Sequence, residues 1–403
     1  MVRSDQPRIA ILGAGPIGIE AALYARQLKL PVTVYERGRV GEHLHRWGHV
    51  RLFSPFGMNV TSLGSSQLDH SLPASNECIT GHEHVEAYLN PLAEQLQDCI
   101  ELQTEVLHLG RRQILKHHLI GDPKRGKQPF ILYLRNEGQE RIEEADVVLD
   151  CTGTYSQPRR MGEGGIPALG ELALQKEIAY SLVDVCGEKK SEYLGKTTLI
   201  LGGGYSAATT VCQLAKLAEE DDSTWIVWLA RTSNSQPIKR IANDPLKERD
   251  RLAMRANTLA TRAEGNVEFY SQCVVESVSK TEDGYEVRGR IAGRERTWEA
   301  EKIIANVGFT PDTNLYRELQ VHECYASLGP MKLAASLLKQ SGADCLTVGA
   351  QGAETLRNPE PGFFILGNKS YGRGSNFLLR TGFEQIREVF TLITGRKNLN
   401  LYR

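Results

Sequence analysis

The sequence predicts an α/β protein made of two parallel-sheet domains, with the second inserted between two parts of the first. A glycine-rich turn occurs twice, each time between an apolar strand-like run and a helix-like stretch. Segments 147–158 and 303–312 each pass from an apolar run through small residues to a proline, which is typical of a crossing between domains. The predicted domains are therefore 1–158 and 311–403, which together form the first, and 159–310, which is inserted.

The first glycine-rich turn follows the apolar run Ile9–Leu12 and carries Gly13, Gly15 and Gly18. In dinucleotide-binding folds the first glycine allows a tight turn, the second lets the backbone approach a pyrophosphate, and the third lets helix and strand pack closely. The N–H groups at the start of the helix then face the phosphates. The next apolar run ends at Glu36, about twenty residues past the turn, where an acid accepts hydrogen bonds from ribose hydroxyl groups. We therefore expect a bound dinucleotide.

The second glycine-rich turn has small residues at the same three positions, Gly202, Gly204 and Ala207, and alanine is accepted at the third. The strand-like run that follows it ends at Arg231 instead of an acid. A cation suits the 2′-phosphate of NADP, which an acid would repel. The alternative is a solvated residue at a strand end. Further candidates for the same phosphate are Lys239 and Arg240.

The remaining elements follow from the periodicity of apolar residues. Segment 81–93 has the amphipathic pattern of a helix, and 100–109 alternates like a strand. Alternating runs around the Asp283-Gly284 turn indicate a β-meander. Further strands are predicted near 131–134, 147–151, 267–270, 274–278, 285–288, 303–307 and 362–366, and further helices near 245–263 and 381–390.

Composition limits the classes of partner and the compartment. The chain of 403 residues has a formal net charge of −1, so it has no global field that attracts nucleic acid or an anionic membrane. No apolar stretch approaches the roughly twenty residues that a membrane span needs. The eight cysteines form no C-x-x-C pair. Because the first strand begins within about eight residues, we expect no signal peptide, reduced thiols and a cytoplasmic location.

A long irregular segment follows Glu36 and extends to about residue 80. Such a segment inside a compact domain is more often a binding loop than an idle connection. It contains His43, His45 and His49, but no cysteine or carboxylate pattern completes a familiar ligand set. We therefore predict a loop that faces cofactor or substrate, and no metal site.

Two dinucleotide patterns, the second nested within the first domain, are the layout of flavoproteins with two dinucleotide-binding domains, and the chain resembles that superfamily over essentially its whole length. It is similar in particular to flavin-containing monooxygenases and to the thioredoxin-reductase group. The resemblance implies an FAD-binding Rossmann-like (three-layer) domain with an inserted NADPH-binding Rossmann-like domain. The matching stretches are Gly13–Gly18 with Glu36, Thr104–Val106, Cys151–Pro158, Gly202–Ala207 and Phe364–Asn368.

The resemblance also implies which residues hold each cofactor. Glu36 would bind the adenosine ribose of FAD, Val106 the adenine through its backbone, and Gly367 and Asn368 would approach the ribityl chain and its phosphate. The family usually has aspartate where this chain has Asn368, which keeps an acceptor but loses the charge. The FAD candidates are Gly13, Ala14, Gly15, Pro16, Ile17, Gly18, Glu36, Arg37, Val106, Thr152, Gly153, Gly367 and Asn368, and the NADPH candidates are Gly202, Gly204, Tyr205, Ser206, Ala207 and Arg231.

Flavin supplies the redox chemistry, and three hypotheses compete for where the electrons go. The favoured one is a monooxygenase, in which reduced flavin reacts with O2 and a flavin (hydro)peroxide passes oxygen to an N, S or carbonyl group of a small molecule. Trp47 and the tyrosine–proline ending of 152–158 support it. The F-x-G-x-x-x-H fingerprint of the flavin-containing monooxygenases is absent, and 178–184 stands in its place.

The second hypothesis is an NADPH-dependent reductase of a quinone or another small acceptor. The bacillithiol-disulfide-type reductases place a cysteine in the first glycine turn, where this chain has Ile17. Cys151 ends an apolar strand, where a buried structural thiol is the expectation, so a dithiol mechanism is disfavoured. The third hypothesis is a non-catalytic flavin-binding sensor, which has less need of a second nucleotide site with Arg231.

By the resemblance, two loops lie near the isoalloxazine ring, and a cation there would stabilise negative charge on the flavin. Trp47 has an alternative role in core packing, and Arg51 and Arg373 have alternatives as phosphate or surface residues. We predict a small-molecule substrate, with O2 as the second one, and leave a homodimer open. The substrate-side candidates are Trp47, His49, Arg51, Ser54, Lys369, Tyr371, Arg373 and Asn376.

Overall fold

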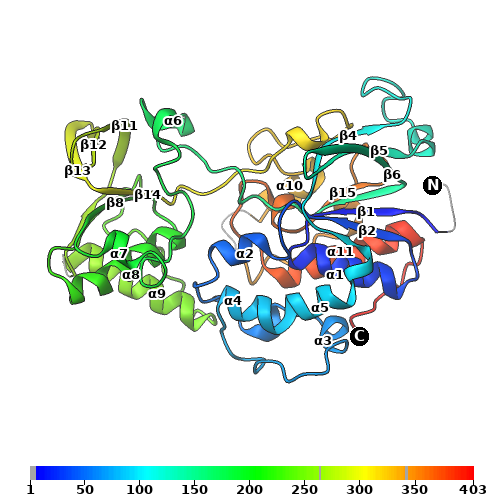
Figure 1. Cartoon of the computed structure of the whole chain (residues 1–403), viewed down its shortest axis with the longest axis horizontal. Helices are drawn as coiled ribbons and strands as arrows, with labels where there is room; N and C mark the ends of the chain where they lie inside the picture. The colour runs from blue at the N-terminus through cyan, green and yellow to red at the C-terminus, as the bar shows by residue number, and fades with distance from the viewer. Residues whose placement is uncertain (1–5, 263–264, 341–343) are drawn as a thin grey trace. The chain divides into compact units, whose positions relative to one another are not determined.

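The computed structural model describes residues 6–262, 265–340 and 344–403, which form two compact units (Figure 1). Unit 1 contains the described residues up to His45 together with Ser54–Gln157 and Thr310–Arg403. Unit 2 contains Arg46–Phe53 and Pro158–Phe309. The predicted boundaries after residues 158 and 310 lie one residue from these, whereas the sequence did not predict that Arg46–Phe53 groups with unit 2.

Unit 1 is built on a five-stranded parallel sheet in the order β15-β7-β1-β2-β3. The central strand β1 is buried on both faces, as expected of a continuous apolar run in a parallel sheet. The strands are β1 (Ile9–Leu12), β2 (Val32–Tyr35), β3 (Ile100–Glu101), β7 (Val147–Asp150) and β15 (Phe363–Ile365).

Two further layers cover the faces of this sheet. On one face Ala10 and Leu12 of β1 pack with Leu109 and Phe130 from an antiparallel three-stranded sheet of β4 (Thr104–Arg111), β5 (Phe130–Asn136) and β6 (Gln139–Ala145). Ile11 points the other way, towards helix α1 (Pro16–Gln27), which packs beside α11 (Leu379–Thr394). The alternation of β1 side chains between the two faces thus produces three layers.

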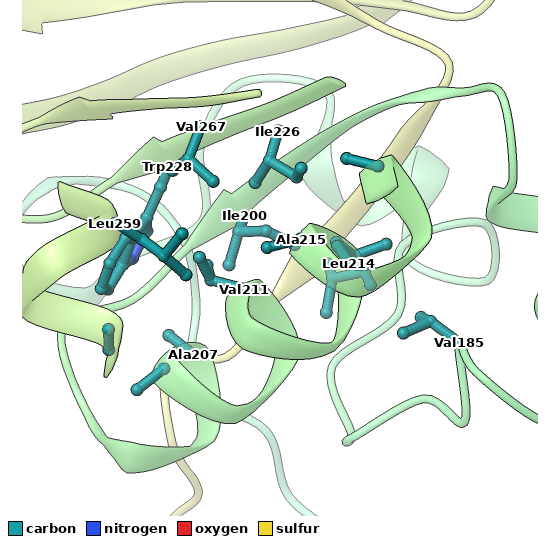
Figure 2. Close-up of a cluster of buried hydrophobic side chains, with 14 of the residues drawn as sticks. Val185, Ile200, Ala207, Val211, Leu214, Ala215, Ile226, Trp228, Leu259 and Val267 are labelled. Carbon is teal, nitrogen blue, oxygen red and sulfur yellow. The ribbon is translucent and has the colours of Figure 1, made fainter. Parts of the chain in front are cut away.

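Unit 2 repeats the plan with a four-stranded parallel sheet in the order β10-β9-β8-β14. Ile200, Ile226 and Trp228 pack against helices α8 (Tyr205–Glu220) and α9 (Lys247–Arg262), as Figure 2 shows. Leu199 and Val227 face the antiparallel sheet of β11, β12 and β13. The strands are β8 (Thr197–Leu201), β9 (Trp225–Leu229), β10 (Val267–Tyr270), β11 (Cys273–Lys280), β12 (Tyr285–Ile291), β13 (Arg294–Ala300) and β14 (Lys302–Ala305). The predicted α/β fold with Rossmann-like parallel sheets is therefore confirmed.

The helix predicted over 81–93 forms with one irregularity. α4 (Gly81–His84) begins with a capping box between Thr80 and Glu83, and a π-helical turn, Val85–Leu89, leads into α5 (Asn90–Gln95). Pro91 has no N–H for the carbonyl of Ala87, and His70 Nε2 donates to that oxygen at 2.9 Å instead.

The remaining helices are short. They are α2 (Glu42–Arg46), α3 (Ser62–Ser65), α6 (Glu171–Leu174), α7 (Lys190–Tyr193) and α10 (Met331–Leu338), with 3₁₀ turns at Phe56–Met58, Gln97–Cys99, Pro123–Lys127, Glu163–Gly165, Asn314–Tyr316, Ala353–Leu356 and Gly367–Tyr371. Across the described residues, no helix combines the length and apolar character needed to cross a bilayer.

Candidate active site

The candidate FAD site of unit 1 lies where parallel strands end together. Leu12 of β1 pairs in register with Tyr35 of β2 and Asp150 of β7, and Asp150 pairs with Ile365 of β15. The loops that follow these strands therefore begin at the same edge of the sheet. Ligands of open α/β sheets bind at this carboxyl edge.

The three glycines of the first turn occupy three different environments. Gly13 has φ +97°, and a Cβ there would lie 3.0 Å from the carbonyl oxygen of Cys151. A Cβ on Gly18 would lie 1.9 Å from the carbonyl oxygen of Gly13, which closes that position to any side chain. A Cβ on Gly15 would meet nothing within 4 Å. Gly13 and Gly18 are thus required by the protein's own packing, whereas Gly15 faces open space at the N-terminus of α1, where a pyrophosphate would fit.

Glu36 braces the turn as well as facing the site. Its Oε2 accepts from Ala14 N–H and its Oε1 from Gly38 N–H, both at 2.8 Å, and the residue is 9% exposed. A carboxylate offers about four lone-pair sites, so both oxygens can still accept from ribose hydroxyl groups. Arg37 next to it is exposed. The bracing contact to Ala14 was not predicted from the sequence.

A buried ion pair joins two of the strand-end loops. Lys369 Nζ lies 2.7 Å from Asp150 Oδ2 and 3.0 Å from Thr152 Oγ1, and both charged side chains are at most 1% exposed. Beside this pair, Asn368 Nδ2 donates to Thr154 Oγ1 at 2.8 Å. These contacts hold Gly367–Lys369 against the segment that follows β7. Sequence analysis singled out Lys369 but not Asp150, although an aspartate that ends an apolar strand was a visible signal.

Ile17 of the first turn packs against Gly367 and Gly382. It is 6% exposed, and a Cβ on Gly367 would lie 3.2 Å from its Cγ1. A Cβ on Gly382 in α11 would lie 2.4 Å from Ile17 Cδ1. Both glycines leave room for this side chain, so Ile17 contributes packing and no polar chemistry.

Two other predicted residues of unit 1 have ordinary structural settings. Val106 pairs with Leu134 in the β4–β5 ladder, immediately before a bulge between Val106 and His108. Burial raises the pKa of the Cys151 thiol, with a smaller contribution from Asp150. A thiol held protonated in this way is a weak nucleophile.

The candidate NADPH site lies at the carboxyl edge of the parallel sheet in unit 2. As in unit 1, one glycine of the turn is required by packing and another faces open space. A Cβ on Gly202 would lie 2.4 Å from the carbonyl oxygen of Asn306, whereas one on Gly204 would meet nothing within 4 Å. Ala207 is fully buried in the third position. Gly204 precedes α8, so the open space again lies at a helix N-terminus.

Two polar contacts stabilise the second turn from the core side. The buried Trp228 donates from Nε1 to the carbonyl of Gly202 at 2.7 Å. Thr210 Oγ1 donates to Asn306 Oδ1 at 2.8 Å, which ties α8 to the end of β14. Ser206 is exposed, and Tyr205 is partly buried with its ring 5.4 Å from that of Phe53.

Arg231 lines an open cavity of about 470 Å³ at the end of β9, together with Ser233 and Gln272. The exposed Arg231 forms no ion pair with any residue that the structure describes. Glu163 also lines the cavity, and its carboxylate lies 3.2 Å from the guanidinium of Arg290, which pairs with Glu276 at 2.7 Å as well. Of the two further candidates, Lys239 is exposed, and Arg240 binds Asp250 through two hydrogen bonds of 3.0 and 3.1 Å.

The substrate-side candidates divide between the units. Trp47, His49 and Arg51 belong to unit 2, where Arg51 is exposed and the other two are partly buried. Lys369 and Tyr371 belong to unit 1.

Tyr371 is 4% exposed and packs against Phe377, with ring centroids 5.5 Å apart. Ser54 is buried and donates to Asn59 Oδ1 at 2.8 Å. Arg373 and Asn376 are exposed. The contacts of all these candidates with a substrate stay predictions.

Known proteins share the sequence pattern and the fold. A family model described as pyridine nucleotide-disulphide oxidoreductase matches residues 7–324. No curated protein matches the chain. The bacillithiol disulfide reductase of Bacillus cereus superposes with a TM-score of 0.71 at 14% identity, over 97% of this chain and 100% of that one.

An N-hydroxylase and a thioredoxin reductase share the fold as well. An ornithine N-hydroxylase of Kutzneria sp. 744 gives a TM-score of 0.65 at 13% identity, over 98% of this chain and 100% of that chain. Thioredoxin reductase of T. acidophilum gives a TM-score of 0.61 at 14% identity, over 97% of this chain and 99% of that chain. At these identities the likeness establishes the fold alone.

Proposed function

This chain belongs to the pyridine nucleotide-disulphide oxidoreductase family, and from that premise we propose that it is an NADPH-consuming flavin monooxygenase acting on a small molecule. The predicted membership of the two-dinucleotide-binding flavoprotein superfamily is confirmed. The chain is an oxidoreductase, and its cofactors are FAD and a pyridine nucleotide. The proposal adds the preference for NADPH, O2 as oxidant, and a nucleophilic N, S or carbonyl group as the site of oxygenation.

FAD fits the residues at the carboxyl edge of unit 1. The open space at Gly15 admits the pyrophosphate to the first N–H groups of α1, and Glu36 keeps free acceptor sites for the ribose. Asn368 offers its carbonyl oxygen, because its amide nitrogen is the atom that binds Thr154. When bound, FAD supplies the redox chemistry, and the chain supplies position and charge.

Lys369 acts in this proposal as a positioning residue. Its ammonium is buried against Asp150 and Thr152, so it holds the Gly367–Lys369 turn in place and its charge is balanced within the unit. The loop that presents Asn368 is thereby fixed before cofactor arrives. A preorganised loop spends less free energy on ordering when the cofactor binds.

The geometry of unit 2 supports NADPH over NADH. The 2′-phosphate carries the charge that distinguishes the two nucleotides, and Arg231 at the end of β9 meets the position where that phosphate projects in Rossmann folds. Arg231 is exposed and lines an open cavity, with no carboxylate of the described chain paired to it. A guanidinium binds phosphate through charge-assisted hydrogen bonds.

The packing of Ile17 bears on which molecule accepts the electrons from reduced flavin. A cysteine at this position or a C-x-x-C pair would carry electrons to a disulfide, but Ile17 packs between Gly367 and Gly382, and the sequence has no C-x-x-C. The Cys151 thiol has a raised pKa that keeps it protonated. With no thiol relay of either kind, we infer that reduced flavin reacts with O2 directly. Use of O2 and a cytoplasmic location are predictions of this proposal, and a homodimer stays open.

A second candidate is an NADPH-dependent reductase of a quinone or another small acceptor. The absence of F-x-G-x-x-x-H favours it. Stopped-flow spectra of the NADPH-reduced enzyme mixed with O2 separate the two. A monooxygenase passes through a long-lived second spectral species before the oxidised spectrum returns, and releases little peroxide. A single-step return with stoichiometric peroxide, and faster reoxidation by a quinone, would contradict the proposal and favour the reductase.

A further inference from the structure

The connection between β4 and β5, residues 112–129, exposes three apolar side chains. Figure 1 shows the course of its backbone. We call it the β4–β5 loop. Leu115 is 59% exposed, Leu119 41% and Ile120 78%. Single exposed apolar residues are ordinary, but three within six positions form a patch that needs an explanation.

The loop holds this shape by means of a buried polar centre. Arg125 is fully buried, and its Nη1 donates to the carbonyls of Leu115 at 2.9 Å and His118 at 3.0 Å. Its Nε donates to Glu360, which also pairs with Arg111 at 2.8 Å, and all three charged side chains are 0% exposed. The carbonyl of His118 also accepts from Gln320 Nε2 at 3.0 Å.

This inverts the usual arrangement of a surface loop. Guanidinium and carboxylate groups occupy the inside, and Leu115, Leu119 and Ile120 point outward. Because the backbone carbonyls are bound by Arg125 and Gln320, the apolar side chains cannot turn inward without breaking those hydrogen bonds.

The charges around the patch are almost all positive. Arg112, Lys116, Lys124 and Lys127 are exposed, and Asp122 is the single acid between residues 112 and 127. Asp122 Oδ1 accepts from the backbone N–H of Lys124 at 2.8 Å. Arg112 pairs with Glu144 outside the loop, while no ion pair involves Lys124 or Lys127 within the part of the chain that the structure describes.

We propose that the β4–β5 loop docks this protein on a membrane surface that contains anionic phospholipid. Leu115, Leu119 and Ile120 would enter the boundary between headgroups and acyl chains, and Lys124 and Lys127 would bind the lipid phosphates. An outward-curving loop enters a soft headgroup layer without a matching surface, whereas a protein partner needs a complementary groove. The near-neutral charge of the whole chain, which predicted no membrane partner, conceals this local patch.

Sedimentation of the FAD-loaded full chain with vesicles tests the proposal. We expect binding to phosphatidylcholine vesicles that contain phosphatidylserine, little binding to pure phosphatidylcholine, and release by high salt. One cation at an anionic surface contributes about fivefold to the partition coefficient. Lys124→Glu with Lys127→Glu should therefore weaken binding at least about 25-fold, and Leu119→Ser with Ile120→Ser should abolish it.

Matched controls separate docking from misfolding. Ile142 is 57% exposed on β6 outside the loop, so Ile142→Ser should bind vesicles like the unaltered protein. The loop variants should keep their FAD and their NADPH oxidation rate, because no candidate residue for binding either cofactor lies in the loop. No binding to anionic vesicles by the unaltered chain would overturn the proposal. Equal capture by immobilised polyglutamate that survives Leu119→Ser with Ile120→Ser would overturn it in favour of an acidic protein partner.

Discussion

The two glycine-rich turns have the same framework and opposite surroundings. Each has one glycine closed by packing and one that faces open space, namely Gly13 and Gly15 in unit 1 and Gly202 and Gly204 in unit 2. In unit 1 the acid beyond the turn, Glu36, is buried and accepts hydrogen bonds from the N–H groups of Ala14 and Gly38. In unit 2 the cation beyond the turn, Arg231, is exposed and lines a cavity.

We propose that this difference separates a site that retains its cofactor from one that exchanges it. The loops around the first turn are joined to each other by the Lys369–Asp150 ion pair and by the hydrogen bond from Asn368 to Thr154. Trp228 donates to the second turn from the core side, and Arg231, beyond the end of β9, has no ion pair with a described residue. The same local motif therefore serves two kinetic roles, depending on what the strand ends carry.

The largest expected effect is the loss of stability when a side chain is added at Gly18, the packed glycine of the first turn. In Gly18→Ala the new Cβ would lie 1.9 Å from the carbonyl oxygen of Gly13, so helix and turn must separate. We expect a loss of at least about 3 kcal/mol of unfolding free energy, or no folded protein, measured by urea denaturation. Gly15→Ala is the matched control, because its Cβ meets nothing within 4 Å, and it should keep the fold and lose FAD affinity. Equal stability of the two variants would contradict the assignment of roles.

Breaking the buried ion pair should have the next largest effect. Lys369→Met leaves the Asp150 carboxylate fully buried without a cation, at a cost of about 3–5 kcal/mol. Urea titration of the FAD-loaded protein measures this loss. The double variant Lys369→Met with Asp150→Leu removes both charges and should recover most of the stability. A single variant as stable as the parent would show that the pair does not hold the loop.

The helices after the two turns should respond differently to pH. Burial raises the pKa of Glu20 in α1 to about 7, whereas the buried polar residue of α8 is Thr210, which does not titrate. An acid with a raised folded pKa contributes stability that is fully present below its unfolded pKa and is lost as pH rises through the folded value. Stability of unit 1 should therefore fall between about pH 4.5 and pH 7, by at most about 3 kcal/mol.

Glu20→Gln should remove this slope, because a neutral amide can still bind Thr61 and Tyr88, which now contact the carboxyl at 2.7 and 3.2 Å. Thermal denaturation across that pH range is the measurement. His84 works in the opposite direction, since burial lowers its pKa to about 4 and its stabilising neutral form is lost as pH falls from about 6.5. The stability of Glu20→Gln should thus fall more steeply on acidification than the stability of the parent. An unchanged pH profile would refute the linkage.

The open glycine of the second turn should give the smallest effect. Gly204→Ala adds a Cβ to empty space at the start of α8, so the fold and the FAD content should be unchanged. The methyl group occupies room for the pyrophosphate, and we expect about a tenfold rise in the KM for NADPH. A fall in FAD content in this variant, with normal NADPH kinetics, would exchange the roles assigned to the two turns.

The parallel sheets and both turns could be predicted from the sequence because they depend on local signals. Apolar runs, glycine spacing and the residue at the strand end all lie within about thirty residues of one another. Glu36 and Arg231 were identified in this way. The bond from Ala14 to Glu36 was missed because a spacing does not reveal which backbone groups an acid can reach.

Long-range pairs lay beyond the sequence pattern. Asp150 and Lys369 are 219 positions apart, and only the alignment of β7 beside β15 brings them together. The grouping of Arg46–Phe53 with unit 2 likewise depends on tertiary contacts. The inward-facing Arg125 was missed because a basic segment is ordinarily taken as a solvated surface, and its charge is balanced by Glu360 far along the chain.

In the proposed function, unit 1 keeps FAD while unit 2 selects NADPH through Arg231. The most direct test is equilibrium titration of the FAD-loaded protein with NADP⁺ and NAD⁺, for the parent, for Arg231→Ala, and for Arg240→Ala as the control whose guanidinium already binds Asp250. We expect tighter binding of NADP⁺ by the parent, and a loss of about 10- to 100-fold of that preference in Arg231→Ala with FAD content unchanged. Arg240→Ala should change the preference little. Equal affinity of the parent for both nucleotides, or a preference that survives Arg231→Ala, would contradict this role of Arg231.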